Sequence, residues 1–322
     1  MNLDFSAYQQ RYPFKIVFRN WWTLKELKGM IALFFVPVAL IASGLQWYLR
    51  LPNPFESDGY WGLVVFILGL GFLGFYSWLV LKLHERTKNK LRLQSFATEN
   101  NFTYSETANS LNLDGVLFRS GNIPEKNRVY DLLTGSYEGK NIAVGNRHFE
   151  MKAPRHNIQF DYGFLSIQLD KKLPQMILRS KKKGMELTLG YTKNQVQSLE
   201  GDFDDHFTLF TQDGHKTDAL YVLTPDVMAL LIDYAADYDI EITGDHIYFY
   251  ARQFDLSEAL FRQLFEIVDV VGTKTKRQTK RFTDATSNQA NGLQISNPAV
   301  WSIATTTAVI IGTLLRFYFL IN

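Results

Sequence analysis

Residues 59–81 have the sequence GYWGLVVFILGLGFLGFYSWLVL, and Asp58 and Lys82 flank this run of 23 residues without a charged side chain. A helix needs roughly 20 apolar residues to cross the hydrocarbon core of a bilayer. Residues 29–49 form a second uncharged run, and residues 298–321 form a third in which only Arg316 is charged. We therefore predict three transmembrane helices, at 29–49, 59–81 and 298–321.

Basic residues on one side of these runs predict the orientation of the chain. The loop at 50–58 holds one basic residue, whereas many lie before the first run and after the second. Positively charged flanks stay in the cytoplasm. We expect a multi-pass protein of the inner cell membrane, with a cytoplasmic N-terminus and main domain and an external C-terminus. The basic flanking residues are Arg11, Lys15, Arg19, Lys25, Lys28, Lys82, Arg86, Lys88, Lys90 and Arg92.

The overall composition narrows the possible chemistry. The 322 residues include no cysteine, which excludes disulfides, thiolate zinc sites, iron–sulfur clusters and a cysteine nucleophile. The net charge of +2 argues against a uniformly basic nucleic-acid-binding chain. No cofactor is expected, because neither a P-loop nor a paired-histidine motif occurs.

Two glycine or small-residue patterns lie inside the apolar runs. Gly69, Gly71 and Gly74 match the dinucleotide pattern G-x-G-x-x-G, but this match is accidental, because it lies within an apolar helix and no strand precedes it. In the third run, Ala304, Ala308 and Gly312 have the four-residue spacing that lets helix backbones approach closely. We predict that these three small residues pack against another helix.

Residues 82–281 change from helical to strand periodicity and predict an α+β domain. Glu138-Gly139-Lys140 lies between two β-rich runs and indicates a hairpin, and a second hairpin is expected at Gly244-Asp245. Further strands are expected at 186–191, 207–211 and 220–223. A helix should begin at Thr224-Pro225, and another should end at Gly272. The fold class is a membrane-anchored α+β protein whose domain has a largely antiparallel sheet with helices.

These patterns divide the chain into seven segments. They are a cytoplasmic or interfacial segment at 1–28, the first transmembrane helix at 29–49, an external loop at 50–58, the second transmembrane helix at 59–81, the cytoplasmic domain at 82–281, a polar tether at 282–297 and the third transmembrane helix at 298–321.

Charge is unevenly distributed within the domain. Residues 185–273 hold 17 acidic and 4 basic side chains, a net charge of −13. Nucleic acid is therefore not expected as a partner of this part, whereas a protein with a basic surface could dock there. Five basic residues follow it, and we expect them to meet anionic lipid head groups. They are Lys274, Lys276, Arg277, Lys280 and Arg281.

One short segment could carry chemistry. Carboxylates and an imidazole lie close together in residues 202–206, and such groups can hold a divalent cation or act as a general base. The spacing is not that of an EF-hand, and a solvated charged loop is the alternative interpretation. The weak candidates for a metal site are Asp202, Asp204, Asp205 and His206.

Three segments together carry a family resemblance: Leu199–Phe203, the helix start in Ala219–Met228 and the Asp239–Ile242 part of the predicted hairpin. The sequence resembles uncharacterised bacterial integral membrane proteins that have paired N-terminal spans and a cytoplasmic α+β domain. The resemblance implies this layout and no activity, cofactor or catalytic residue.

Three functions are compatible with these features. The first is a non-enzymatic, membrane-anchored cytoplasmic scaffold or interaction module. The second is a membrane-tethered enzyme with a metal or general-base site around Asp202–His206. The third is an accessory subunit of a transport complex. A transporter core is not expected, because no apolar run has a charged residue near its centre.

Overall fold

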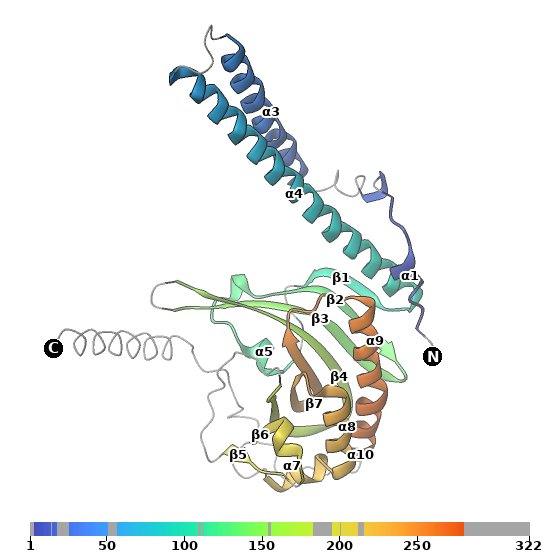
Figure 1. Cartoon of the computed structure of the whole chain (residues 1–322). Helices are drawn as coiled ribbons and strands as arrows, with labels where there is room; N and C mark the ends of the chain where they lie inside the picture. The colour runs from blue at the N-terminus through green and yellow to red at the C-terminus, as the bar shows by residue number, and fades with distance from the viewer. Residues whose placement is uncertain are drawn as a thin grey trace, which may run out of the picture. The chain divides into compact units, whose positions relative to one another are not determined.

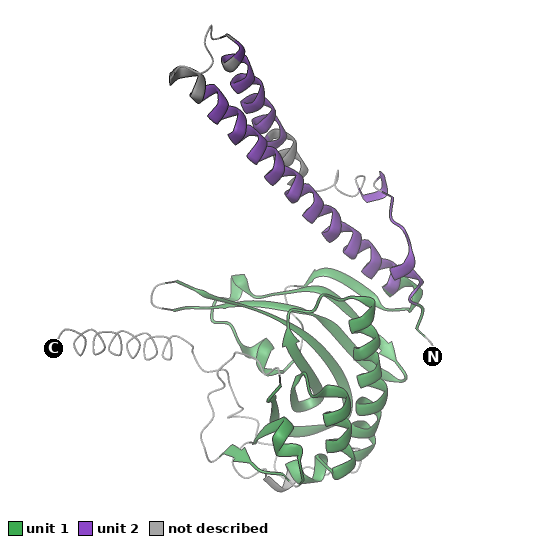
Figure 2. Cartoon of the chain, in the orientation of Figure 1, with its two compact units in different colours: residues 1–4, 97–322 green, residues 5–96 purple. Residues whose placement is uncertain are grey.

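A computed structural model describes residues 3–13, 15–17, 26–50, 57–108, 111, 113–153, 156–182, 195–199, 201–211 and 216–279. The chain divides into two compact units (Figure 2). Residues 5–96 form the helical unit, and residues 1–4 and 97–322 form the sheet unit. The predicted tether at 282–297, the third run at 298–321 and the predicted strand at 186–191 lie outside the described residues.

The helical unit is built on two long helices. α3 (Glu26–Arg50) and α4 (Ser57–Glu99) run side by side as an antiparallel hairpin (Figure 1). Glycines allow the two backbones to meet, because a Cβ atom on Gly44 would lie 2.6 Å from the backbone nitrogen of Phe66. Gly69, from the accidental G-x-G-x-x-G match, serves the same contact, and a Cβ there would lie 2.7 Å from Ile41 Cγ1.

The prediction of three transmembrane helices is wrong. Among the described residues, one helix is long and apolar enough to cross a membrane, and it is the Trp61–Glu99 part of α4. The described apolar part of α3, Leu33–Trp47, is shorter than the roughly 20 residues that a bilayer requires. The run at 298–321 lies outside the described residues.

A short N-terminal segment packs within the helical unit along the polar half of α4, residues 82–99. It begins with α1 (Ser6–Gln9), and the rings of Phe5 and Tyr8 contact Phe96, with centroid distances of 5.3 and 5.8 Å. The Tyr12 hydroxyl donates a hydrogen bond to Ser95 Oγ at 3.1 Å. These contacts cover apolar side chains in the polar half of α4, which follows its apolar half at residues 57–81.

The sheet unit contains an antiparallel sheet, as predicted. The described strands form one seven-stranded sheet in the order β1-β2-β3-β4-β6-β5, with β7 paired to β4. β4 is the centre: β3 and then β6 pair along one of its edges, and β7 pairs along the other. The strands are β1 (Thr103–Ala108), β2 (Arg128–Tyr137), β3 (Lys140–Met151), β4 (Ile158–Ser180), β5 (Val196–Gln197), β6 (Phe207–Thr211) and β7 (Asp239–Arg252).

The hairpin prediction succeeded at one position and failed at the other. β2 and β3 pair through a tight turn in which Glu138 and Gly139 have φ values of 48° and 68°. No hairpin forms at Gly244-Asp245, because β7 continues through Gly244 and stays paired with β4 on both sides of it. The register shifts opposite Gly244, whose φ is 54°, so the glycine bends one long strand.

Helices cover one face of the sheet (Figure 1). The Phe265 ring lies 4.8 Å from Tyr137 and 5.6 Å from Phe102, and Leu165 and Ile167 are fully buried on this face. The described helices of this region are α6 (Phe203–His206), α7 (Lys216–Val222), α8 (Pro225–Ala235), α9 (Glu258–Ile267), the π-helical turn η3 (Val268–Gly272) and α10 (Thr273–Thr279).

One predicted strand and one predicted helix end differ from the structure. α8 begins at Pro225 as expected, but residues 220–222 of the expected strand belong to α7. The buried residues Ala219 and Val222 of α7 lie three positions apart, a helical spacing that the short apolar run alone did not reveal. Gly272 does not end the preceding helix, because α9 continues through η3 into α10.

The opposite face of the sheet holds a second core under a short helix. α5 (Val116–Arg119) follows an extended segment and is succeeded by a 3-10 turn, η1 (Pro124–Lys126). Val116 and Leu117 are buried in one cluster with Phe164, Tyr248 and Tyr250 of the sheet. The sheet is therefore buried on both faces, which explains why its central strand lacks simple alternation of apolar and polar residues.

Candidate functional site

Among the candidates at residues 202–206, Asp204 has structural hydrogen-bond partners. Asp202 precedes α6, and Asp204 accepts hydrogen bonds from the Ser198 hydroxyl and from the backbone N–H of Leu199, the latter at 3.1 Å. The Lys181 ammonium also donates to the carbonyl of Asp204. Across the described part of the chain, no group of three or more His, Asp or Glu side chains is arranged to hold a metal ion. Asp204 thus fastens the turn before β6.

The five basic residues that we predicted to meet lipid have different environments in the structure. Lys274 forms an ion pair with Asp226 at 2.6 Å, and Lys276 forms one with Asp170 at 3.1 Å. Arg277 is exposed and lines a pocket. Lys280 and Arg281 lie outside the described residues, as do the helix-packing candidates Ala304, Ala308 and Gly312.

Several carboxylates of the acidic stretch 185–273 are buried or paired with basic residues outside the stretch. Asp239 is buried and accepts a 2.6 Å hydrogen bond from the backbone N–H of Ser180. Asp237 pairs with Lys182 at 2.9 Å, and Asp226 pairs with Lys274 at 2.6 Å. The charge of −13 therefore overstates the negative charge that the stretch offers to a partner. Docking of a basic protein there stays a prediction.

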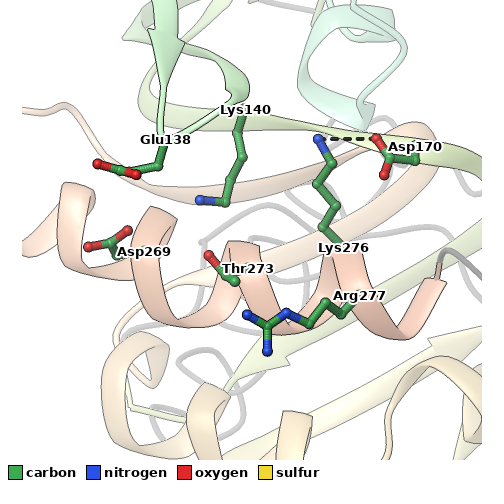
Figure 3. A pocket seen from close by; sticks show the side chains of 7 residues that line it. All are labelled: Glu138, Lys140, Asp170, Asp269, Thr273, Lys276 and Arg277. Atoms are coloured by element: carbon green, nitrogen blue, oxygen red, sulfur yellow. Dashed lines mark ion pairs between the residues drawn. The ribbon is translucent and has the colours of Figure 1, made fainter. Parts of the chain in front are cut away.

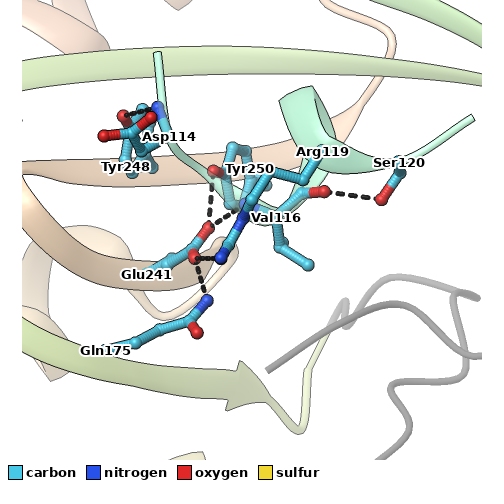
Figure 4. A network of polar contacts seen from close by, with 8 residues as sticks. All are labelled: Asp114, Val116, Arg119, Ser120, Gln175, Glu241, Tyr248 and Tyr250. Carbon is cyan, nitrogen blue, oxygen red and sulfur yellow. Dashed lines mark hydrogen bonds and ion pairs between the residues drawn. The ribbon is translucent and has the colours of Figure 1, made fainter. Parts of the chain in front are cut away.

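Glu241 of β7 is the centre of a buried polar network (Figure 4). Oε2 accepts hydrogen bonds from the Val116 backbone N–H at 2.6 Å and the Tyr250 hydroxyl at 2.8 Å. Oε1 accepts from Gln175 Nε2 at 2.5 Å and Arg119 Nη2 at 3.4 Å. Burial raises the pKa of the Glu241 carboxyl, although these donors oppose the shift.

The network has a structural role. A carboxylate accepts about four hydrogen bonds, and Glu241 already receives four. Its side chain is fully buried, so no ligand can reach it. The Glu241 network joins the α5 segment to the sheet.

A pocket on the helix-covered side offers accessible charged groups (Figure 3). Its volume is about 360 Å³, and it lies between the β2–β3 turn, β4 and the end of the η3–α10 helix. Three carboxylates and three cationic side chains line it, together with the hydroxyl of Thr273. The carboxylates are Glu138, Asp170 and Asp269, and the cations are Lys140, Lys276 and Arg277.

The charges in this pocket are not all paired with each other. The ion pair between Lys276 and Asp170 neutralises two of them, and Lys276 also donates to the Gly139 carbonyl at 3.2 Å. Lys140 is buried, and that burial lowers the pKa of its ammonium group, although Asp269 and Glu138 oppose the shift. Among the residues the structure describes, Arg277 has no ion-pair partner.

The pocket exists because of local backbone features. The tight β2–β3 turn places Glu138 and Lys140 on either side of Gly139. A Cβ on Gly272 would lie 3.2 Å from Ile167 Cδ1 and 3.6 Å from Lys140 Cδ, so glycine lets the helix approach the sheet there. The π-helical turn η3 directly precedes Thr273, and such turns often occur at functional sites.

Two of the pocket residues were singled out in the sequence, but for contact with lipid. Lys276 and Arg277 were assigned to the lipid surface, and Lys140 was recognised only as part of a turn. No local signal connects Lys140 with Asp269, because the sheet and the helix bring them together. The helix continues through Gly272, and this continuation places Asp269, Thr273 and Arg277 on one helix.

Comparisons with known proteins give no family assignment. No protein-family model and no curated protein sequence matches the chain. One solved structure resembles it in fold, the crystal structure of the mycobacterial trehalose monomycolate transport factor A, TtfA, with a TM-score of 0.37 and 13% sequence identity. The match covers 58% of this chain and 89% of that one.

Proposed function

We propose that this chain is a membrane-anchored binding module, in which α4 enters the bilayer and the sheet unit offers the charged pocket to a small polar ligand. The apolar half of α4 carries the first part of this proposal. Only 6% of its most apolar window is buried within the protein. A helix that is apolar all round and unburied needs a lipid environment.

Individual side chains along α4 agree with an environment of lipid. Ile67, Leu68 and Phe75, which lie within about two turns of the helix, are between 54% and 56% exposed. Trp61 and Trp78, which lie near the two ends of the apolar half, are 63% and 53% exposed, as expected for aromatic side chains at the head-group level. Lys82 lies over the Trp78 ring at 4.9 Å, where the apolar half ends.

The basic residues that follow the apolar half favour a cytoplasmic sheet unit. Lys82, Arg86, Lys88, Lys90 and Arg92 all belong to the polar half of α4, which leads into that unit. Positive residues next to a membrane helix are retained on the cytoplasmic side. The scaffold with a basic protein partner, the accessory role in transport and the family resemblance remain predictions from the sequence.

Membrane anchoring is tested with the full chain and alkaline carbonate, which releases peripheral proteins but not inserted helices. The wild-type chain should stay in the membrane pellet. The double variant Ile67→Lys and Leu70→Lys should be depleted from the pellet, because each charge at the centre of a bilayer helix costs about 2.5–3.5 kcal/mol. Gln94→Lys, in the polar half of α4, is the control and should stay. Release of the wild-type chain would refute the anchor.

The natural absence of cysteine makes the orientation measurable. Glu125→Cys places one thiol at an exposed position of the sheet unit. A membrane-impermeant maleimide should label it in inverted vesicles and not in intact cells. Labelling in intact cells would place the sheet unit outside and contradict the proposal.

A further inference from the structure

We infer that the pocket between the β2–β3 turn and the η3–α10 helix binds a phosphate monoester, whose oxyanion lies between Lys140 of β3 and Arg277 of α10. This inference names the ligand class for the binding module proposed above and rests on that proposal. It comes from the cationic side chains of the pocket, which reach it from the strand on one side and from the helix on the other (Figure 3).

Lys140 is the central observation, because its charged side chain is buried without a close partner. The residue is 4% exposed, yet it lines the pocket. Its ammonium group interacts electrostatically with Asp269 and Glu138, but no residue in the described part of the chain accepts a hydrogen bond from it or forms an ion pair with it. Burial lowers the pKa of this ammonium group, and the charge of Lys276 lowers it further. A ligand anion supplies the missing acceptors and lies between the two like charges.

The pocket keeps an excess of positive charge once its existing pairs are counted. Glu138 already has a cationic partner, because a hydrogen bond from the N-terminal ammonium group lowers the pKa of its carboxyl. Lys276 and Asp170 form an ion pair at 3.1 Å. One carboxylate then remains against two cationic side chains, which gives a net charge of +1. These three residues are Asp269, Lys140 and Arg277.

The helix side of the pocket presents donors that suit a phosphate group. Thr273, Lys276 and Arg277 of α10 have the spacing i, i+3 and i+4, so their side chains are neighbours on one face. Arg277 has no ion-pair partner among the described residues, and a guanidinium group offers a phosphate two parallel hydrogen bonds. The Thr273 hydroxyl supplies a further donor beside it.

The arrangement of these donors favours a phosphate monoester over a carboxylate. Because the donors belong to β3 on one side and α10 on the other, the anion needs oxygens that point in different directions. A phosphate monoester has three acceptor oxygens and a charge of about −1.5 to −2 near neutral pH, whereas a carboxylate has two oxygens and one charge. The cavity of about 360 Å³ falls within the range of about 300–1,000 Å³ that is typical of small-molecule sites.

Glycerol phosphate is the probe for this inference, because it is a phosphate monoester with a small organic group. Binding is measured by titration calorimetry on the full chain in an uncharged maltoside detergent and a phosphate-free buffer. Acetate is the comparison ligand. Glycerol phosphate should bind at least about tenfold more tightly than acetate, which lacks the third oxygen and the additional charge.

Two variants remove the proposed donors from opposite sides of the pocket. Lys140→Met and Arg277→Gln should each weaken glycerol phosphate binding about tenfold or more, because each removes a charged hydrogen-bond donor. Lys126→Met and Arg262→Gln make the same exchanges at exposed positions that do not line the pocket, and both should bind like the wild-type chain. Thermal denaturation shows whether each variant is folded. Because Arg277 is exposed, Arg277→Gln tests the site even if Lys140→Met does not fold.

The phosphate group could belong to a lipid head group or to a soluble metabolite. Dihexanoyl phosphatidic acid, a short-chain lipid with the same phosphate monoester, distinguishes the two sources. Dihexanoyl phosphatidylcholine measures the contribution of the acyl chains alone, which is subtracted. Tighter binding of phosphatidic acid than of glycerol phosphate indicates a lipid, and the reverse order indicates a soluble metabolite; both support the phosphate site.

Three results would overturn the inference: acetate binding as tight as that of glycerol phosphate, no binding of any probe, or undiminished binding in Arg277→Gln. An equal loss of binding in the Lys126→Met and Arg262→Gln controls would overturn it as well. A chain that stays in carbonate-washed membranes but binds no probe would show that this inference fails while the anchor holds.

Discussion

The backbone N–H of Val116 donates a 2.6 Å hydrogen bond to Oε2 of Glu241, which lies 125 residues further along the chain. This contact joins the first turn of α5 to the central part of the sheet. Tyr250 and Gln175 donate to the same carboxylate, so one side chain satisfies donors from three separate segments. The position of the α5 segment therefore depends on Glu241.

Removing the Glu241 carboxylate should destabilise the sheet unit strongly. Glu241→Ala leaves the Val116 N–H, the Tyr250 hydroxyl and the Gln175 amide without their buried acceptor. We expect the free energy of unfolding to fall by about 3 kcal/mol or more. Urea denaturation of the full chain in detergent, followed by the circular dichroism of the sheet, measures this change. Glu125→Gln, at an exposed position, should change the unfolding free energy by less than about 0.5 kcal/mol. A similar small change for Glu241→Ala would show that the network is not structural.

The raised pKa of Glu241 predicts how stability depends on pH. A carboxyl whose pKa is higher in the folded than in the unfolded state holds its proton longer in the folded state. Its contribution to stability is therefore complete below the ordinary glutamate pKa and is lost as the pH rises through the folded-state value. The difference in unfolding free energy between the wild-type chain and Glu241→Gln should shrink as the pH rises above the ordinary glutamate pKa. Other titrating groups affect both proteins equally and cancel. A difference that grows with pH would show that the pKa is lowered instead.

The contact between α3 and α4 should not tolerate a methyl group at Gly44. A Cβ there would lie 2.6 Å from the Phe66 backbone nitrogen and 2.9 Å from the Gly62 carbonyl oxygen. Gly44→Ala should therefore lower the thermal stability of the helical unit in detergent, as expected when bulk is added to a close helix contact. Gly71→Ala is the matched control, because a Cβ on Gly71 meets no atom within 4 Å. It should leave stability unchanged or raise it by up to about 1 kcal/mol through helix propensity. Equal effects at the two positions would show that α3 and α4 are not in close contact.

Gly163 of β4 should be equally restricted, for a different reason. A Cβ at this position would overlap the ring of Phe254, whose backbone N–H donates to Asn146 Oδ1 at 2.7 Å and whose carbonyl accepts from Asn146 Nδ2 at 3.1 Å. Because Asn146 holds this segment in place, the ring cannot move away freely. Gly163→Ala should cost about 1–3 kcal/mol of unfolding free energy. In a Phe254→Leu background the same substitution should cost less, and additive effects in this double-mutant cycle would argue against the overlap.

Local sequence patterns predicted those elements that depend only on residues close together in the chain. The uninterrupted apolar run at 59–81 lies in a continuous helix, and the basic residues after it extend that helix to Glu99. Glu138-Gly139 forms its hairpin turn because two residues with positive φ satisfy the geometry without help from other segments. Pro225 begins α8, since proline fits the first turn of a helix wherever the helix packs.

Long-range pairing decided the features that sequence reasoning missed. Gly244-Asp245 has the residues of a hairpin turn, yet β7 stays extended because β4, at 23 residues, is long enough to pair with it on both sides of the bend. Glu241 appeared to be one of many acidic surface residues, and only the fold shows that donors from α5 and β4 join Tyr250 of its own strand around it.

The apolar helix, the antiparallel class of the sheet and the sharpest turns could therefore be predicted from the sequence, since each depends on the conformational preferences of neighbouring residues or on the apolar surface of one segment. Which charges meet depends on how the elements pack in three dimensions. Lys140 joins Asp269 in one pocket because the β2–β3 turn packs beside the η3–α10 helix, and the absence of a side chain on Gly272 permits that approach. Electrostatic complementarity depends on distances through space, and these are set by packing between elements far apart in the chain.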